Sequence, residues 1–338
     1  MKTRAILLKN HGELILTERN LVVGDTDVLV KTEYASICGT DKNIYLGNVS
    51  QEHYTMEMHG KGNPLYNNRE VPKLPFWIGH EGGGIVIETG KYVHEFKPGD
   101  KVMSFGWSGT YADYFVSPAR NLEKVPEGLD IKIASLGEPA GCAMFSALNS
   151  GVNLGDTAVV IGTGFAGLII IQGLKKKGAY KVIAVDKSDQ KLKVAQEMGA
   201  DVIINVDKEE VILRILNETN MKGADLVVEA AGTEESFNTA TSILKHNGIF
   251  VLYSYITKPI TVNIGRWHDD AFEIKTTCLV HHTENERQIW AQWALRPIVL
   301  GQINIDKLIT HEFKLNEVQK AFEVVCNDPD AIKVMLKP

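Results

Sequence analysis

The spacing of apolar and polar residues changes along the chain near Asn149. Before this point, short runs of alternating character are separated by turn-forming residues, as in Val28–Ser36, Gly83–Gly90 and Tyr111–Val116. This pattern predicts a β-rich first part. After Asn149, short apolar runs such as AVVIG and KVIAVD alternate with helical patterns, which we expect at about 165–177, 189–198, 209–219 and 235–245. Such alternation is typical of a parallel sheet covered by helices on both faces, so the predicted class is α/β.

The end of the chain predicts a return to the first part. A helical pattern near Glu286–Leu300 is followed by ITHEFKL and KVMLK, a stretch too short to fold alone. A length of 338 residues suits two domains better than one core. We therefore expect a catalytic domain over 1–148 and 288–338, and a nucleotide-binding domain over 149–287.

Composition excludes several classes of protein. The formal charge of −6 gives no basic surface for nucleic acid, and 44% hydrophobic residues argue against disorder. No run approaches the roughly 18 apolar residues of a membrane span, and the apolar stretch at the N-terminus is too short for a signal peptide. Four scattered cysteines form no disulfide framework, which favours a reducing cytoplasm.

A glycine-rich motif predicts dinucleotide binding. Gly162, Gly164 and Gly167 follow an apolar strand and open a helix, with Phe165 and Ala166 between them. In a Rossmann fold these glycines make the tight turn, admit the pyrophosphate and let helix and strand pack closely. Asp186 ends the next strand, where its carboxylate would bond both ribose hydroxyls and repel a 2′-phosphate. The alternative is a glycine turn with a surface aspartate; the motif in its strand and helix context favours NAD.

Three short segments carry residues that bind metals: CGTD from Cys38, GHEGGG with His80 and Glu81, and EPAGC with Glu138. A catalytic zinc needs about three N, S or O ligands and an open position. Cys38, His80 and either glutamate would supply them. Taken singly, a cysteine or histidine is more often a structural core residue.

These motifs, with VIGTGFAG, VVEAAG and ITHEFKL, resemble the zinc-dependent medium-chain dehydrogenase family in order and over nearly the whole chain. The similarity is greatest to the sorbitol, threonine and butanediol dehydrogenase branches. The resemblance implies a GroES-like catalytic domain joined to a Rossmann domain, with the active site between them. It also implies a homodimer or homotetramer, joined in many relatives through the edge of the nucleotide-domain sheet.

The resemblance also assigns roles to individual residues. It implies zinc ligation by Cys38 and His80, with Glu138 as the third ligand and Glu81 as a carboxylate that can exchange onto the metal. Asp41 would orient His80. Further implied roles are a hydrogen bond from the substrate oxygen to Thr40, and contact of the adenosine ribose with Lys191, which could equally be a solvated helix lysine. The implied reaction is metal-assisted hydride transfer from an alcohol to NAD.

The sequence departs from the family in two ways that concern the metal and the proton. The stretch KVMSFGWSGTYADYFV lacks the four cysteines that bind a structural zinc in many relatives, so we expect one zinc per subunit. Asn43 stands where a histidine usually ends the proton relay, and an amide cannot accept that proton. Water, His53 or His59 would have to complete the path.

A third departure is an insertion between the ligands, roughly Gly47–Pro75. It is either a surface elaboration or oligomer contact, or it covers the substrate entrance. In the second case substrate contacts would come from Asn43 and Tyr45 before it and His59 within it.

The leading interpretation is a zinc- and NAD-dependent dehydrogenase of a secondary alcohol that is a polyol, sugar or cyclitol-like molecule. A threonine-type hydroxy amino-acid dehydrogenase is the alternative on the same fold. A zinc-free quinone reductase and a non-enzymatic cofactor-binding protein are less favoured, because both would be expected to lack Cys38 and His80.

Overall fold

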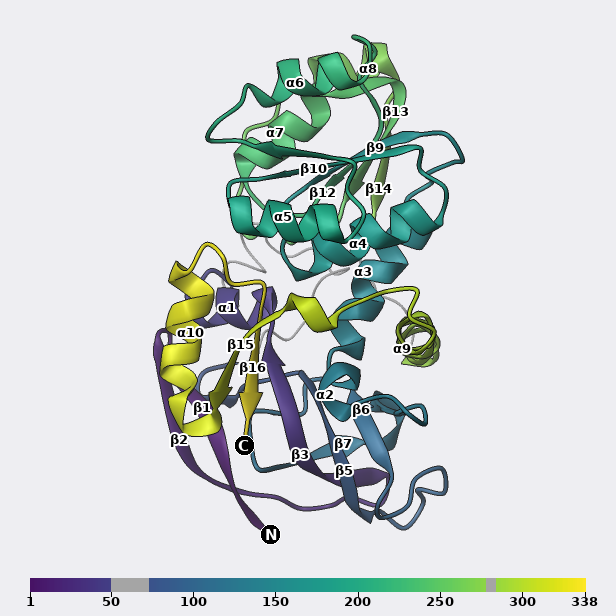
Figure 1. Cartoon of the computed structure of the whole chain (residues 1–338). Coiled ribbons are helices and arrows are strands. Elements are labelled where there is room, and N and C mark those ends of the chain that lie inside the picture. Colours follow the sequence, from purple (N-terminus) through teal and green to yellow (C-terminus); the bar gives the residue numbers. More distant parts are fainter. Residues whose placement is uncertain (50–72, 278–283) are drawn as a thin grey trace.

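The computed structural model describes residues 1–49, 73–277 and 284–338. They form two lobes, one built mainly from the first part of the chain and one from the residues after Asn149 (Figure 1). The predicted His53 and His59 and most of the Gly47–Pro75 insertion lie outside the described residues. Within those residues no helix is both long and apolar enough to cross a membrane.

The first lobe is built around the long strand β3, which is Asp27–Ile37. A seven-stranded sheet runs in the order β15-β16-β3-β5-β6-β8, and β7 also pairs with β3. A small second sheet has the order β2-β1-β4. The other elements of the first part are β1 (Lys2–Asn10), β2 (Glu13–Asn20), α1 (Gly39–Tyr45), β4 (Phe76–Trp77), β5 (Glu81–Thr89), β6 (Lys101–Ser104), β7 (Tyr114–Pro118), a 3-10 turn (Ala119–Asn121), β8 (Leu122–Lys124), α2 (Ile131–Ala134) and α3 (Gly137–Asn149).

The second lobe is a six-stranded parallel sheet in the order β11-β10-β9-β12-β13-β14, which confirms the predicted α/β fold. The order reverses between β9 and β12, and dinucleotides bind at the carboxyl ends of strands flanking such a point. Its elements are β9 (Thr157–Ile161), α4 (Phe165–Lys176), β10 (Lys181–Asp186), α5 (Asp189–Glu197), β11 (Val202–Asn205), α6 (Val211–Glu218), β12 (Ala224–Glu229), α7 (Glu234–Ser242), β13 (Leu244–Leu252), α8 (Gly265–Asp270) and β14 (Glu273–Thr276).

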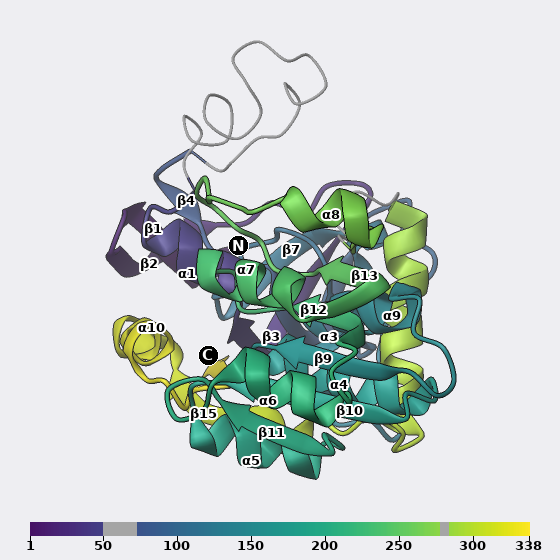
Figure 2. The same ribbon diagram turned by 90° about the horizontal axis from the view of Figure 1, so that it is seen from above.

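Helices cover both faces of this sheet because its strands are apolar on both sides. Val160 packs in one buried cluster with residues of α4 and α5, while its neighbour Val159 packs in another with residues of α6 and α7. This follows from the alternation of side chains along a strand. In Figure 1, α6 and α7 lie above the strands and α4 and α5 below them, and Figure 2 looks down onto the order of the strands from β13 to β11.

The end of the chain returns to the first lobe, as predicted. The helix α9 (Glu284–Val299) is followed by β15 (Ile309–Lys314), α10 (Val318–Asn327) and β16 (Lys333–Lys337), with 3-10 turns at Asp306–Leu308 and Leu315–Glu317. β16 pairs antiparallel with β3, and both chain termini lie in this lobe (Figure 1). The domain boundaries at 148/149 and 287/288 remain a proposal; they fall within α3 and α9.

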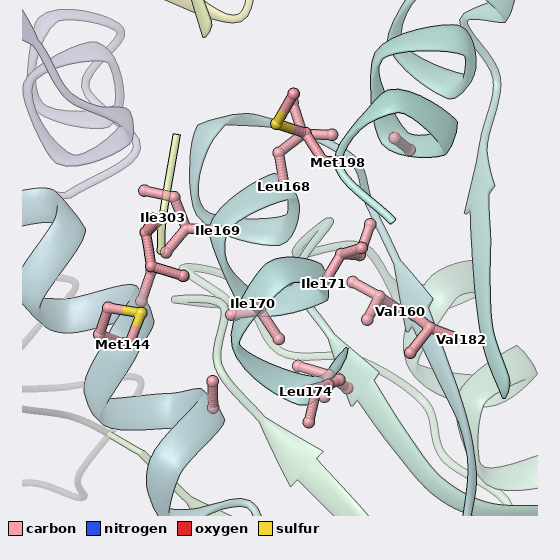
Figure 3. Packing of buried hydrophobic residues seen from close by; sticks show 14 of the residues in the cluster. Met144, Val160, Leu168, Ile169, Ile170, Ile171, Leu174, Val182, Met198 and Ile303 are labelled. Atoms are coloured by element: carbon pink, nitrogen blue, oxygen red, sulfur yellow. The ribbon is translucent and has the colours of Figure 1, made fainter. Parts of the chain in front are cut away.

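The main core joins the two lobes through the packing of α3 against α4 (Figure 3). Met144 of α3 meets Ile169 and Ile170 of α4, and Ile303 closes the cluster from the segment that returns to the first lobe. Gly173 of α4 allows this approach, since a Cβ there would lie 2.5 Å from Cβ of Ala147. The core therefore fixes the nucleotide lobe against the helix that carries Glu138.

Two predicted boundaries differ from the structure. The helix predicted to reach Lys245 ends at Ser242, because Leu244 already pairs with Ala224 as the start of β13. The strand predicted at Tyr111–Val116 begins at Tyr114. Tyr111 and Ala112 instead lie beside β1, where the Tyr111 carbonyl accepts a hydrogen bond from Ile6 N.

Candidate metal and dinucleotide site

Antiparallel pairing brings the predicted ligands together. Ser36 near the end of β3 is the register partner of Glu81 at the start of β5. Cys38 follows β3 as the N-cap of α1, and His80 precedes β5, so both lie at this end of the strand pair. The ligand atoms of Cys38, His80 and Glu81 lie within 4.8 Å of one another. We call these three residues the metal group.

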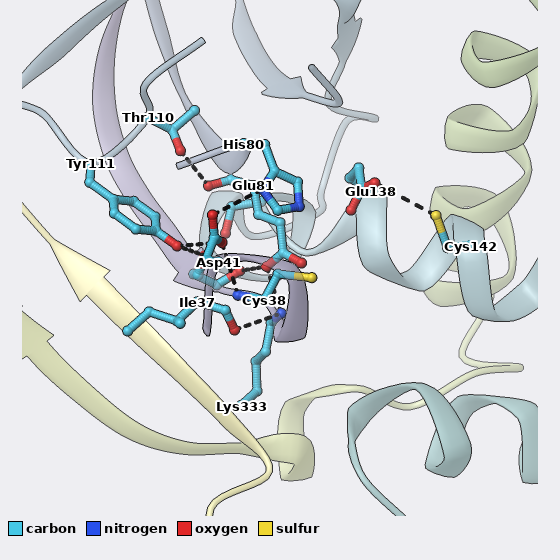
Figure 4. Close-up of polar contacts among 12 residues, drawn as sticks. Ile37, Cys38, Asp41, His80, Glu81, Thr110, Tyr111, Glu138, Cys142 and Lys333 are labelled. Carbon is cyan, nitrogen blue, oxygen red and sulfur yellow. Dashed lines mark hydrogen bonds and ion pairs between the residues drawn. The ribbon is translucent and has the colours of Figure 1, made fainter. Parts of the chain in front are cut away.

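Buried hydrogen bonds orient the histidine (Figure 4). His80 Nδ1 lies 3.2 Å from Asp41 Oδ1, which leaves Nε2 for a metal. Asp41 Oδ2 accepts from the Tyr111 hydroxyl at 2.7 Å and from Cys38 N at 3.1 Å. Asp41 is fully buried, and its contacts support the predicted orienting role.

Glu81 is held by a buried lysine. Lys333 Nζ lies 2.5 Å from Glu81 Oε2, and Ser36 Oγ also donates to that oxygen. Register explains the pairing, because Val334, next to Lys333, lies opposite Ile37 in the β16–β3 ladder. The other oxygen, Glu81 Oε1, is buried and has no hydrogen-bond partner among the described residues.

This donor set fits a metal cation. A buried carboxylate oxygen without a partner is costly unless a cation occupies it, and here a thiol and an imidazole lie beside it. Sulfur, nitrogen and oxygen ligands of this kind are typical of zinc.

The groups around Glu81 shift one another's pKa. Burial, together with the charge of Glu81, raises the pKa of Cys38. Burial opposes protonation of His80, but Asp41 and Cys38 together outweigh it and hold the pKa of His80 well above its ordinary value. Burial likewise opposes the charge of Lys333, and the carboxylate of Glu81 raises the pKa of Lys333 above its ordinary value. The carboxylates of Asp41 and Glu81 thus stabilise the positive charges of His80 and Lys333, whereas burial and Glu81 disfavour the thiolate of Cys38.

Glu138 lies near the metal group but outside it. It is in the first turn of α3, where its Oε1 accepts from Cys142 Sγ at 3.6 Å, and Figure 4 shows it to the right of His80, toward Cys142. Burial raises the pKa of Glu138, and the charges of His80, Glu81 and Lys333 also act on it. Zinc ligation by Glu138 stays a prediction.

The other predicted residues on α1 differ in their surroundings. Thr40 lies in the first turn, two residues after Cys38. Asn43 Oδ1 accepts a hydrogen bond from Asn48 Nδ2 at 3.1 Å. Tyr45 is buried in the core of the first lobe, with its ring 4.8 Å from that of Phe322 and its hydroxyl accepting from Gln319 Nε2. Contact of Tyr45 with a substrate would require this packing to open.

The glycine motif connects β9 to α4. Gly162 has a φ of +96°, and a Cβ there would meet the backbone of Ala230 and Ala231 at the end of β12. Gly167 lies so close to the Gly162 carbonyl oxygen that a Cβ would overlap it. Gly164 is the N-cap of α4, and no heavy atom lies within 4 Å of its Cβ position. Of the residues between the glycines, Phe165 is buried and Ala166 half-buried.

Asp186 ends β10 and holds the glycine turn. Its Oδ2 accepts from Thr163 N at 2.7 Å and Thr163 Oγ1 at 2.9 Å, and its Oδ1 accepts from Ser188 N at 3.0 Å. Lys191 on α5 is half-buried; burial lowers the pKa of Lys191, against the opposing charges of Asp186 and Asp330. Contact of Asp186 and Lys191 with the adenosine ribose stays a prediction.

Sequence reasoning missed three residues that hold the metal group: Ser36, Tyr111 and Lys333. Lys333 carried a signal, since it is a lone charge opening the apolar run KVML. Ser36 and Tyr111 carried none, because their contacts depend on pairing across distant segments.

With this fold and site in place, comparison with known proteins identifies the class. The chain matches the Alcohol dehydrogenase GroES-like domain over residues 24–127 and the Zinc-binding dehydrogenase family over 166–296. The chain belongs to the zinc-dependent medium-chain dehydrogenase family.

Individual relatives cover almost the whole chain. It is 30% identical to an L-threonine 3-dehydrogenase of Bacillus velezensis, over 96% of each chain. Its fold is similar to that of 2R,3R-butanediol dehydrogenase from Bacillus subtilis, with a TM-score of 0.84, 24% identity and 99% of each chain covered. It is also similar to an Escherichia coli alcohol dehydrogenase solved with NADH, with a TM-score of 0.83, 25% identity and 100% and 99% coverage. The chain is thus an oxidoreductase of the zinc-type alcohol and threonine dehydrogenase kind.

Proposed function

We propose that this protein is a zinc-dependent dehydrogenase that transfers hydride from a secondary alcohol, of the polyol, sugar or cyclitol-like class, to NAD. The observation that carries the proposal is the buried, unpartnered Oε1 of Glu81 beside Cys38 and His80. Relatives that are alcohol and threonine dehydrogenases support the reaction class.

One zinc ion per subunit would be held by Cys38, His80 and a carboxylate, with either Glu81 or Glu138 as the resting third ligand and the fourth position open. A bound zinc supplies a Lewis acid that favours removal of the proton from the substrate hydroxyl. Asp41 fixes the His80 ring, and Lys333 holds Glu81 Oε2, so that Oε1 points to the ligand position. We assign to Thr40 the hydrogen bond with the substrate oxygen.

We assign NAD as the acceptor. Gly162, Gly164 and Gly167 allow the pyrophosphate to approach the N-terminus of α4, whose amide groups favour a negative charge. Asp186 would bond the ribose hydroxyls and disfavour a 2′-phosphate. Replacement Asp186→Ser should raise kcat/KM for NADP relative to NAD by at least about tenfold. An unchanged ratio would contradict this assignment.

A threonine-type activity is a second candidate, and the 30% identical relative favours it. A single panel separates the two. The zinc-loaded enzyme is supplied with NAD and, in parallel, with polyols, aldoses, inositols, simple secondary alcohols, L-threonine and other hydroxy amino acids. The highest kcat/KM on a polyol, sugar or cyclitol supports our proposal, and the highest value on L-threonine supports the second candidate.

The role of zinc is tested on the same enzyme. Cys38→Ser should lose bound zinc and turnover, while Cys326→Ser, a free and half-buried cysteine on α10, should retain both. Full turnover by Cys38→Ser, or the finding that the purified wild-type enzyme contains no zinc, would refute the proposal and favour a zinc-free reductase.

Asn43 leaves the proton path without its usual final acceptor. A histidine titrates near neutral pH and an amide does not. We therefore expect Asn43→His to add an ionisation to the pH–rate profile of alcohol oxidation. Asn48→His, at the partner amide, serves as the control. A profile identical to wild type would show that the path does not pass this position.

Assembly and location are also part of the proposal. We propose a homodimer or homotetramer joined through β14, an edge strand whose Ile274 is 46% exposed. We also propose a cytoplasmic location, because the four cysteines are scattered along the sequence and form no disulfide framework.

A further inference from the structure

An exposed tryptophan lies against the metal group. The ring centre of Trp107 is 4.4 Å from that of His80, and the two planes are tilted by 36°. On the same indole, the ring of Phe76 makes an edge contact at 6.5 Å. Trp107 is nevertheless 51% exposed. A large aromatic face is therefore open beside a residue that we assign as a metal ligand.

The segment that carries Trp107 is well ordered by hydrogen bonds. Gly109 N donates to Gly79 O at 3.0 Å, directly before His80. Ser108 Oγ donates to Ser117 Oγ at 2.9 Å, and Arg19 Nη1 donates to Ser108 O at 3.3 Å. The exposure of Trp107 is thus not the result of a loose loop. Leaving so much indole in water forgoes burial energy, which suits a surface that a ligand covers.

We propose that Trp107 is a specificity-determining residue whose open face stacks on the C–H face of a polyol or sugar substrate. The inference rests on the proposed function, since it takes the substrate hydroxyl to bind at the metal group. His80 uses Nδ1 for Asp41, so its Nε2 faces the ligand position, and the indole packed on that imidazole lies within the length of a short polyol from it.

The polar groups around the metal group complete such a site. The carboxyl of Glu138 lies one helical turn from Cys142. Tyr253 directly follows β13, and burial, followed by the charges of Cys142, Cys38 and Glu138, raises the pKa of its phenol. Tyr253 enters from the nucleotide lobe and Trp107 from the first lobe. An aromatic wall with a few convergent polar groups is the usual composition of a site for a small polar molecule.

Stacking favours one substrate class over another. Polyols and sugars present C–H groups between their hydroxyls, and a flat ring can cover them. The indole offers no cation to the carboxylate of a hydroxy amino acid, and a short alcohol such as 2-propanol would scarcely reach it. Loss of the indole should therefore affect long or cyclic polyols far more than short alcohols.

The experiment compares Trp107→Ala and Trp107→Phe in the zinc-loaded enzyme with NAD. For the best sugar or cyclic polyol, we expect Trp107→Ala to lower kcat/KM by at least about tenfold, mostly through KM, and Trp107→Phe to retain most of it. With 2-propanol both variants should remain within roughly threefold of wild type. Trp293→Phe, a tryptophan 55% exposed on α9, is the matched control and should match wild type throughout.

Each outcome decides the proposal. An equal loss on polyols and 2-propanol, or no loss on either, overturns stacking while leaving the dehydrogenase function intact. If the wild-type enzyme does not reduce NAD with any of the alcohols tested, both the stacking proposal and the proposed dehydrogenase function are overturned. If Trp107→Ala loses zinc, its kinetics cannot test stacking, and the proposal is then tested with Trp107→Phe by measuring tryptophan fluorescence. Addition of the polyol to the NADH-bound enzyme should shift the emission to shorter wavelength in wild type, because the polyol displaces water from the exposed indole, and should not do so in Trp107→Phe. An equal shift in both overturns the proposal.

Discussion

At the residue scale, the metal group is a set of buried charges whose partners come from four separate segments. Cys38 and Asp41 lie at α1, His80 and Glu81 at β5, Tyr111 before β7, and Lys333 on β16. Each partner satisfies an atom that would otherwise be buried without a hydrogen bond, and Glu81 Oε1 is the exception. A cation bound at Glu81 Oε1 would therefore satisfy the one oxygen of this group that lacks a partner.

Asp41 provides the first prediction at this scale. It accepts hydrogen bonds from His80, Tyr111 and the backbone of Cys38. Asp41→Asn should weaken zinc binding by about 10–100-fold, because the ring of His80 loses its charged acceptor. Competition with a chelator measures the affinity. Tyr111→Phe, which leaves the carboxylate in place, should weaken binding less, and a larger loss in Tyr111→Phe than in Asp41→Asn would contradict the assigned order.

Lys333 provides a second prediction. Removing one partner of a buried ion pair leaves an uncompensated charge, at a cost of about 3–5 kcal/mol. Lys333→Met should destabilise the zinc-free protein by that amount, and zinc should restore much of the loss because it supplies positive charge to Glu81. Chemical denaturation with and without zinc measures both values. Lys337→Met, exposed on the same strand, should have little effect in either state. Equal destabilisation of both states by Lys333→Met would refute this account.

How far these residues could be predicted depends on where their signals lie. Cys38, His80 and Glu81 stand in short motifs, so the sequence predicted them as candidate ligands but left open whether Glu81 or Glu138 is the third. Trp107 stands in a stretch noted only for its lack of cysteines, and nothing local shows that its ring packs on His80. Such contacts follow from strand pairing and loop geometry, which a single sequence does not specify.

At the element scale, strand register carries the chemistry. The pairing of Ser36 with Glu81 and of Val334 with Ile37 sets the metal group, and a shift by one residue would turn these side chains to the opposite face of the sheet. The parallel sheet was predictable because its apolar runs are long and regular. The end of α7 was not, because a helical pattern continues past Ser242 into residues that pair in β13.

The glycine motif gives a prediction that separates folding from binding. A methyl group on Gly167 would overlap the Gly162 carbonyl oxygen, so Gly167→Ala should lower the free energy of unfolding by roughly 1–3 kcal/mol. The Cβ position of Gly164 is open, so Gly164→Ala should change stability by less than about 1 kcal/mol. It should nevertheless weaken NAD binding by at least about tenfold, because the methyl group occupies the path of the pyrophosphate. Thermal unfolding and calorimetric titration with NAD measure the two effects. Normal NAD affinity in Gly164→Ala would contradict the assigned site.

At the scale of the whole molecule, the path of the chain couples the two lobes. Ser188 caps α5 in the nucleotide lobe and donates to Asp330 Oδ1, in the segment before β16, at 2.5 Å. The side chain of Gln172 makes two hydrogen bonds with the backbone of Asn304: its Nε2 donates to Asn304 O at 2.9 Å, and its Oε1 accepts from Asn304 N at 2.7 Å. The segment that delivers Lys333 to the metal group is therefore also tied to the lobe expected to bind NAD. The return of the chain was predictable from the shortness of its last segment, whereas these contacts were not.

The free edge of the nucleotide lobe gives the last prediction. β14 pairs only with β13 among the described strands, and its residues are largely exposed. Unpaired edge strands readily pair with another chain, and a charge pointing out of an edge discourages this. We therefore expect Ile274→Asp to convert the proposed oligomer into single chains, as measured by light scattering after size exclusion. Leu154→Asp, at a residue 87% exposed in the turn before β9, should leave the assembly unchanged. An oligomer that persists in Ile274→Asp would show that the interface lies elsewhere on the molecule. A wild-type protein that is a single chain in solution would contradict the proposed assembly.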